Sequence, residues 1–325
     1  MADERRVRPV RCAIVLAGGA GRRLQSFVYR LRGDTLPKQY VPFVGSRSLL
    51  SQTVDRVERL IPSERVWIVA TQSHVQFPEA RDQLGCRPPG TVVLQPENRE
   101  TGPGVLLPLV YLDARYPNAV VGLFPSDHFI DPEGLFMGYV DLAFRAVESD
   151  SQGLVLLGVE PDRAESEYGY IVPAWYRSVR AVPGLRRVAT FVEKPTCSQA
   201  QELAAHGALW NTMVMVCRPQ TLMRAVARAA PALRHAFERV RGALGTGHET
   251  RVVEEVYRDL ASVNFSRAVL EAIPTLGRPS LWVLPVRGVY WSDWGSEQRI
   301  SGTLEWRRRR SPSVRMAVGI GADAV

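Results

Sequence analysis

The apolar segment at residues 12–17 leads directly into the glycine-rich stretch GGAG at 18–21, and this junction constrains the fold more than any other feature of the chain. Six apolar residues followed by glycines predict a buried strand that opens into a tight loop. Strand-like and helix-like segments then alternate through the first half of the sequence. This alternation predicts an α/β fold with a doubly wound, mainly parallel but mixed sheet, in which ligands bind beyond the carboxyl ends of the strands.

The other expected elements follow from the spacing of apolar residues. Strands are expected at 66–70, 92–94, 119–124, 154–159, 167–171, 188–193, 282–284 and 289–291, and helices near 49–61, 103–115, 222–241 and 252–260. Asp131 and Pro132 predict the start of another helix, with Asp131 as its N-cap and Pro132 in its first turn. Residues 1–307 are expected to form one domain and residues 308–325 a basic, flexible tail.

Charge and composition exclude several classes of protein. The net charge of +8 is concentrated near the ends, because residues 2–12 carry +2 and residues 302–325 carry +3, so a nucleic-acid partner is not expected. No apolar run is long enough to cross a membrane and no signal-peptide cleavage site follows the first apolar segment, so a cytoplasmic location is expected. The four scattered cysteines predict buried thiols rather than zinc ligands or disulfides.

Lysine is nearly absent from the sequence. Of 41 basic side chains only Lys38 and Lys194 are lysine, a bias that we attribute to the composition of the coding sequence. The two that remain are candidates for positions that need a compact ammonium, such as a site among phosphate oxygens, although chance retention is the alternative.

The glycine loop does not match either familiar nucleotide-binding motif. Leu24 stands where a dinucleotide fingerprint requires its third glycine, and a Walker A motif is absent. What remains is a loop whose backbone amides can approach phosphates, next to Arg22 and Arg23, or else a tight turn without a ligand.

Two aspartates follow predicted strands directly. Asp127 follows the strand at 119–124, and Asp293 follows the strand at 289–291. If they converge in a phosphate-binding cleft they would bind Mg²⁺, although capping or loop roles are the alternative. His128, beside Asp127, is expected to be a structural hydrogen-bonding residue rather than a catalytic base.

Eight short motifs occur in a fixed order: LAGGAGRRL at 16–24, PKQ at 37–39, QPENRETGP at 95–103, FPSDH at 124–128, YGYI at 168–171, VEKP at 192–195, WNT at 210–212 and WSDWGS at 291–296. Over residues 10–300 this set resembles the sugar-1-phosphate nucleotidyltransferases and is most similar to the mannose-1-phosphate guanylyltransferases. The resemblance implies a Rossmann-like nucleotidyltransferase fold. It also implies a Mg²⁺-dependent enzyme that makes GDP-mannose and pyrophosphate from GTP and mannose 1-phosphate, with a homodimer compatible with the family.

Two alternatives remain open at this point. One is a thymidylyl- or uridylyltransferase that acts on glucose 1-phosphate, and the other is a non-catalytic regulator that binds nucleotide sugars. Magnesium-dependent pyrophosphate release would separate catalysis from binding.

The resemblance also assigns residue roles. The catalytic residues would be Arg23, Lys38, Asp127 and Asp293, with Asp127 and Asp293 holding Mg²⁺. The nucleotide would be bound by Ala17, Gly18, Gly19, Gly21, Gln95, Arg99 and Pro103. The sugar phosphate would be bound by Gly169, Glu193, Lys194 and Asn211.

Several positions depart from the family pattern. Arg22 replaces a common hydroxyl residue, and Gly102 and Gly104 replace common alanines. Met213 stands where glycine is usual and Ser266 where aspartate is usual. The last two changes border the sugar side, so the sugar is the less defined substrate.

Overall fold

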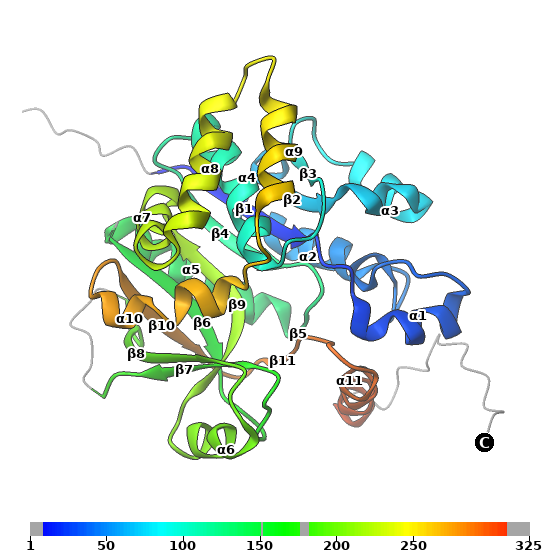
Figure 1. The fold of residues 1–325 in the computed structure, drawn as a ribbon. Helices are drawn as coiled ribbons and strands as arrows, with labels where there is room; N and C mark the ends of the chain where they lie inside the picture. The colour runs from blue at the N-terminus through cyan, green and yellow to red at the C-terminus, as the bar shows by residue number, and fades with distance from the viewer. Residues whose placement is uncertain (1–8, 151, 176–181, 311–325) are drawn as a thin grey trace, which may run out of the picture.

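The computed structural model describes residues 9–150, 152–175 and 182–310. Their main element is a nine-stranded mixed sheet of order β3-β2-β1-β4-β9-β6-β10-β8-β7, in which β7 also pairs with β9 (Figure 1). A separate two-stranded ribbon joins β11 to β5. The strands are β1 (Arg11–Ala17), β2 (Val66–Thr71), β3 (Val92–Gln95), β4 (Val120–Pro125), β5 (Phe129–Asp131), β6 (Gly153–Val159), β7 (Gly169–Pro173), β8 (Arg186–Glu193), β9 (Leu209–Cys217), β10 (Ser280–Val286) and β11 (Tyr290–Ser292).

The α-helices cover both faces of the sheet. They are α1 (Gln25–Arg32), α2 (Leu49–Glu58), α3 (Pro78–Gly85), α4 (Thr101–Arg115), α5 (Glu133–Ser149), α6 (Cys197–Ala205), α7 (Pro219–Ala229), α8 (Pro231–Ala243), α9 (Glu249–Asp259), α10 (Ile273–Leu276) and α11 (Glu297–Arg310). Helices α2 and α5 pack on one face, whereas α4, α7, α8 and α9 form the layer on the other. In Figure 1 the α8–α9 pair stands at the top and α11 lies apart at the lower right.

Strand β1 shows how the sequence specifies two cores. Ala13 and Val15 belong to the core beneath α2 and α5, whereas Cys12 and Ile14 belong to the core beneath α4 and α7. Because side chains alternate between the faces of a strand, a sheet covered on both faces needs such a continuously apolar run.

The predicted α/β architecture is confirmed, and one strand explains why the sheet is mixed. Strands β3, β2, β1 and β4 are parallel, as the alternation of the first half predicts. Strand β9 was identified in the sequence only through its WNT motif, and it runs antiparallel to both β4 and β6. The second half of the chain therefore joins the first within one sheet.

Three sequence predictions need correction. Asp131 is not a helix N-cap: it ends β5, and Pro132 is the N-cap of α5. The helix predicted at 222–241 is divided between α7 and α8, because Pro231 cannot donate the backbone hydrogen bond that a continuous helix requires. Cys86 and Cys197 are exposed rather than buried, although all four thiols are free.

Helix α11 extends past residue 307, where the expected domain ends. Helix α11 continues to Arg310, so residues 308–310 of the expected tail are helical, and residues 311–325 lie outside the described residues. Trp306 of this helix stacks on Tyr290 at 4.2 Å between ring centroids. The helix is thereby joined to β11.

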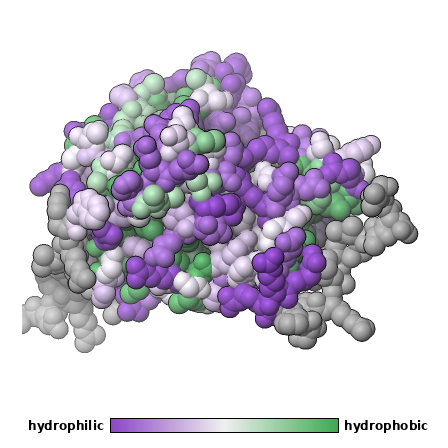
Figure 2. Space-filling model, turned by 90° about the horizontal axis from the view of Figure 1, so that it is seen from below, coloured by the Kyte–Doolittle hydropathy of each residue, from purple (hydrophilic) through white to green (hydrophobic). Residues whose placement is uncertain are grey.

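Within the described part of the chain, no helix is both long and apolar enough to cross a membrane. Figure 2 shows the molecule from below, where hydrophilic residues predominate and hydrophobic ones occur in scattered groups.

Candidate active site

Polar side chains donate hydrogen bonds to the backbone of the glycine loop. Gln39 donates to the carbonyl oxygens of Ala17 and Gly19, at 2.8 Å each, and Thr71 donates to the carbonyl oxygen of Gly18 at 2.8 Å. A Cβ atom on Gly18 would lie 2.4 Å from Gln95 Nε2, and Gly21 has a left-handed backbone with φ +61°. A side chain at position 18 would displace Gln95, and one at position 21 would be strained by the left-handed backbone, so glycine suits both positions.

Lys38 lies at the centre of the site. Its ammonium donates to the carbonyl oxygens of Asp293 and Trp294, at 2.9 and 3.0 Å, and lies 3.0 Å from Asp127 Oδ2. The residue is only 9% exposed. Because a lysine ammonium has three donors on one compact centre, it bridges the two aspartate-bearing loops through a single nitrogen atom, which a planar guanidinium cannot do in the same geometry.

The structure brings the two predicted catalytic aspartates to the same ammonium. Asp127 follows β4, and its carboxylate is part-exposed. The neighbouring His128 is buried, which lowers the pKa of its imidazole, and its Nδ1 accepts a hydrogen bond from the Trp291 indole at 3.2 Å. His128 therefore joins β11 to the Asp127 loop through this hydrogen bond.

Asp293 lies in a dense set of donors. Tyr168 Oη and the Gly295 amide donate to its Oδ1, at 3.0 and 2.9 Å, and Arg299 Nη1 lies 3.1 Å from both carboxylate oxygens. Burial alone would raise the pKa of Asp293, but Lys38 and Arg299 outweigh it and lower that pKa below its ordinary value. The carboxylate is thus stabilised in its charged form.

Arg299 is a site residue that the sequence did not reveal. It lies six positions after Asp293, on α11, and belongs to none of the recognised motifs. Its only sequence signal is a basic residue soon after a candidate catalytic aspartate, which is too common to be diagnostic.

Two cavities of about 430 and 320 Å³ adjoin at this centre, and both are lined by Arg23, Lys38 and Asp127. Of the predicted site residues, those that line one or both cavities are Gly18, Gly19, Gly21, Arg23, Lys38, Gln95, Asp127 and Asp293. Asn98 and Glu100 also line both cavities. They lie within the recognised 95–103 motif, but the sequence assigned them no role.

Three predicted nucleotide-binding residues do not line these cavities. Ala17 is buried at the end of β1, and Pro103 is buried inside α4. The guanidinium of Arg99 is bonded to Glu97 at 2.7 Å instead.

The predicted sugar-phosphate residues form a second cluster. Gly169 is paired in register with Glu193, and a Cβ atom at 169 would lie 2.7 Å from Glu193 Oε2 and 3.5 Å from Asn211 Cβ. Burial raises the pKa of Glu193. Lys194 differs from Lys38, because its side chain is exposed. The cluster is joined to the main site through Tyr168, the residue before Gly169, which contacts Asp293.

The two aspartates would be suitable ligands for a Mg²⁺ ion whose remaining ligands come from substrate and water. Asp127 and Asp293 supply carboxylate oxygens, and Mg²⁺ prefers one or two carboxylates together with waters and phosphate oxygens. Among the described residues, no group of three histidine, cysteine, aspartate or glutamate side chains could hold a metal by itself. A Mg²⁺ ion held by the two aspartates would therefore need further ligands, such as water or phosphate oxygens.

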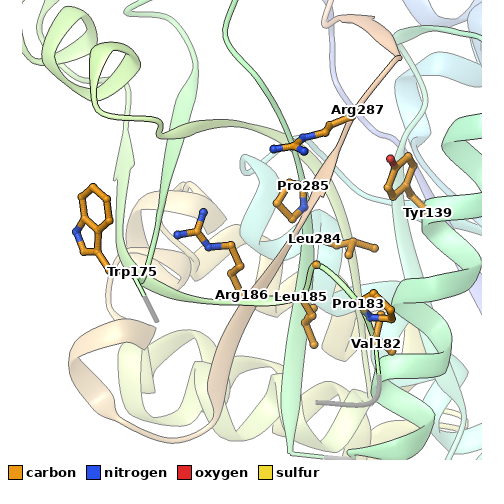
Figure 3. A pocket seen from close by; sticks show the side chains of 10 residues that line it. Tyr139, Trp175, Val182, Pro183, Leu185, Arg186, Leu284, Pro285 and Arg287 are labelled. Carbon is orange, nitrogen blue, oxygen red and sulfur yellow. The ribbon is translucent and has the colours of Figure 1, made fainter. Parts of the chain in front are cut away.

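A cavity of about 770 Å³ lies elsewhere, and it contains none of the predicted site residues. Figure 3 shows Arg186 and Arg287 between Trp175 and Tyr139, with Leu284 and Pro285 of β10 beside them. Arg186 donates to the Ala174 carbonyl oxygen and Arg287 binds Glu160, so both cations already have partners. We do not place the reaction there.

We expect alanine at position 102 and alanine at position 104 to have different effects on stability. A Cβ atom on Gly102 would lie 2.8 Å from the Val263 carbonyl oxygen, which is fixed backbone, whereas one on Gly104 would lie 3.7 Å from Gln95 Oε1. We expect Gly102→Ala to lower the free energy of unfolding by about 1–3 kcal/mol. Gly104→Ala is the matched control and should leave it within about 0.5 kcal/mol, as measured by urea denaturation. Equal effects would contradict the prediction.

Comparison with known proteins agrees with this geometry. The family model described as Nucleotidyl transferase matches residues 12–301, and the chain belongs to this family of enzymes. The xanthan biosynthesis protein XanB of Xanthomonas campestris pv. campestris (strain B100) is 28% identical over 79% of this chain and 53% of its own length. A mannose-1-phosphate guanylyltransferase of Salmonella montevideo is 31% identical over 63% of this chain and 42% of its own. The chain thus spans about half the length of the curated relatives that it matches.

Solved structures show the same fold. A Thermus thermophilus protein described as mannose-1-phosphate geranyltransferase has a TM-score of 0.71 and 27% identity, over 88% of this chain and 76% of that one. A UDP-glucose pyrophosphorylase solved with UDP-glucose has a TM-score of 0.54 and 15% identity, over 93% of this chain and all of that one, which shows the fold alone.

Proposed function

We propose that the protein transfers a nucleotidyl group from a nucleoside triphosphate to a sugar 1-phosphate, with GTP and mannose 1-phosphate as the substrates. The observation that carries this proposal is the convergence of the glycine loop, Lys38, Asp127 and Asp293 at one cleft beyond the carboxyl ends of β1 and β4. An open α/β sheet binds phosphates at such a place.

The chemistry needs alignment rather than a base. A phosphate oxygen of the sugar 1-phosphate attacks the α-phosphorus of the triphosphate, the new P–O bond forms, and the bond to the β-phosphate breaks to release pyrophosphate. The attacking oxygen is already anionic at neutral pH, so no residue needs to remove a proton. The protein must hold two anions together and stabilise the charge on the transferred phosphoryl group.

Each polar element of the cleft suits one part of this task. The amides of the glycine loop and Arg23 would bind the triphosphate, and Lys38 would contact the reacting phosphates. Asp127 and Asp293 would hold Mg²⁺, which supplies charge neutralisation at the phosphate oxygens when bound. Gly169, Glu193 and Asn211 would place the sugar phosphate. The reaction would take place in the cytoplasm, where nucleoside triphosphates are available.

The choice of GTP and mannose rests on the named relatives. Several are mannose-1-phosphate guanylyltransferases, and these support guanine over uracil or thymine. The sugar is supported less directly, because Met213 and Ser266 alter that side of the cleft. Uridylyl or thymidylyl transfer to glucose 1-phosphate is the second candidate, since structures of that kind share the fold.

Pyrophosphate release from a panel of nucleotides and sugar phosphates tests the proposal. We expect kcat/KM for GTP to exceed the values for ATP, UTP and dTTP by at least about tenfold, a difference of about 1.4 kcal/mol, because polar groups that bind one base edge are left unpaired by another. Mannose 1-phosphate should be preferred over glucose 1-phosphate by less, since the two differ in one hydroxyl orientation. If UTP or dTTP with glucose 1-phosphate is the best pair, the guanylyl assignment is wrong. If no pair releases pyrophosphate, the protein is a binder instead.

A further inference from the structure

Arg299 contacts several residues of the candidate active site, although the proposed reaction assigns it no role. It is 8% exposed, and its Nη1 lies 3.1 Å from both carboxylate oxygens of Asp293. Its Nη2 lies 3.0 Å from Glu165 Oε2, and its guanidinium lies 4.5 Å from the centroid of the Tyr168 ring. One side chain thus contacts Asp293 and both ends of the segment 165–168.

The helix that carries Arg299 is fixed against the Asp293 loop. The Trp294 indole donates to Thr303 Oγ1 at 2.9 Å, and that hydroxyl donates to the Arg299 carbonyl oxygen at 2.8 Å. A Cβ atom on Gly295 would lie 2.5 Å from Asp293 Oδ2 and 2.6 Å from Arg299 Nη1. The close pair of Asp293 and Arg299 therefore depends on the absence of a side chain at position 295.

The two aspartates differ in how they are neutralised. Asp127 lies beside the Lys38 ammonium, which it shares with two backbone carbonyl oxygens. Asp293 lies against the Arg299 guanidinium, which it shares with Glu165, and accepts hydrogen bonds from Tyr168 and Gly295. The Arg23 guanidinium lies farther away, with its Nη2 at 3.9 Å from Asp293 Oδ2. Because a bound cation competes with a metal for the same oxygens, Arg299 lowers the tendency of Asp293 to bind a metal in the free enzyme.

We propose that Arg299 is a positioning residue that acts as the resident counter-cation of Asp293 and ties the segment 165–168 to it. This inference rests on the proposed function. Its consequence is that a divalent cation binds together with the nucleotide phosphates rather than before them. A second consequence is that Arg299 couples the metal site to the acceptor site, since residues 165–168 lead directly into Gly169 at the start of β7.

Binding of Mn²⁺, used as a spectroscopic substitute for Mg²⁺ and followed by electron paramagnetic resonance, tests the first consequence. Arg299→Met keeps a long side chain but removes the charge, and we expect it to bind Mn²⁺ at least about tenfold more tightly than the unmodified enzyme when no nucleotide is present. Arg299→Lys keeps the charge and should bind Mn²⁺ as the unmodified enzyme does. In both variants the KM for the sugar phosphate should rise about tenfold or more, because neither methionine nor lysine has the two separate nitrogen atoms by which Arg299 contacts Asp293 and Glu165.

Arg30→Met is the matched control. Arg30 also binds a residue of α11, since its Nη2 lies 2.6 Å from Glu297 Oε2, but this pair is exposed. Arg30→Met should change neither the Mn²⁺ affinity nor the KM for the sugar phosphate.

Unchanged Mn²⁺ affinity in a folded Arg299→Met variant would overturn the counter-cation role. If that variant does not fold, an unchanged KM for the sugar phosphate in Arg299→Lys would overturn the positioning role. Failure of the proposed function would give a different result. The unmodified enzyme would then release no pyrophosphate from any substrate pair, but the Mn²⁺ titration would still measure the effect of Arg299 on metal affinity.

Discussion

Replacing Asp127 with asparagine should lower kcat by a factor of about 10² or more, because the change keeps the shape of the side chain but removes the charge that attracts Mg²⁺. Asp127 is the more available of the two carboxylates, since it is part-exposed and lines both cavities of the cleft. Steady-state pyrophosphate release over a series of Mg²⁺ concentrations measures the effect. The loss should be accompanied by a higher Mg²⁺ requirement.

Asp293→Asn is the informative comparison. It should also lower kcat, but in addition it should lower the melting temperature, because it leaves the buried Arg299 without one of its two charged partners. Asp127→Asn should lower the melting temperature by less, because Lys38 keeps its hydrogen bonds to two backbone carbonyl oxygens. Near-normal turnover of either variant at saturating Mg²⁺ would remove that residue from the metal site.

Lys38→Arg should lower kcat by about 10² although the charge is kept, because a displacement of about 1 Å among reacting groups has effects of that size. The ammonium lies within 3.0 Å of two backbone carbonyl oxygens and the Asp127 carboxylate. A guanidinium there must push the Asp293 loop or Asp127 away from the phosphates. Steady-state kinetics with both substrates saturating measure the loss.

The other lysine of the chain provides the matched control. Lys194 is assigned to the sugar phosphate by the resemblance, but its side chain is exposed and leaves room for a guanidinium. With both substrates saturating, Lys194→Arg should therefore keep kcat within about twofold of the unmodified enzyme. If Lys38→Arg retains most of the activity, Lys38 was retained by chance and its ammonium is not required for the reaction. A large loss in Lys194→Arg would mean that the exposed ammonium contacts the sugar phosphate.

Local patterns predicted most of the elements but not their ends. Parallel strands β1, β2 and β4 were predictable because each is a short apolar run between turn residues. The start of α5 was predicted wrongly because Asp131 and Pro132 match a helix start, yet β11 pairs with residues 129–131 and keeps them extended. Pairing with a strand about 160 residues away therefore outweighed the preference of Asp131 for a helix N-cap. A prediction from neighbouring residues cannot include a strand that is so distant in the sequence.

Residue type and position relative to a strand were sufficient to predict the α/β class, the glycine loop after β1, and Lys38, Asp127 and Asp293 as candidate site residues. They did not predict which of these groups meet in the folded chain. The tertiary structure placed the antiparallel β9 between β4 and β6, brought two aspartates from distant loops to one ammonium, and added Arg299 from α11. The physical reason is that ion pairs and hydrogen bonds depend on distances of about 3 Å between atoms, and spacing along a chain does not specify such distances between residues more than a hundred positions apart.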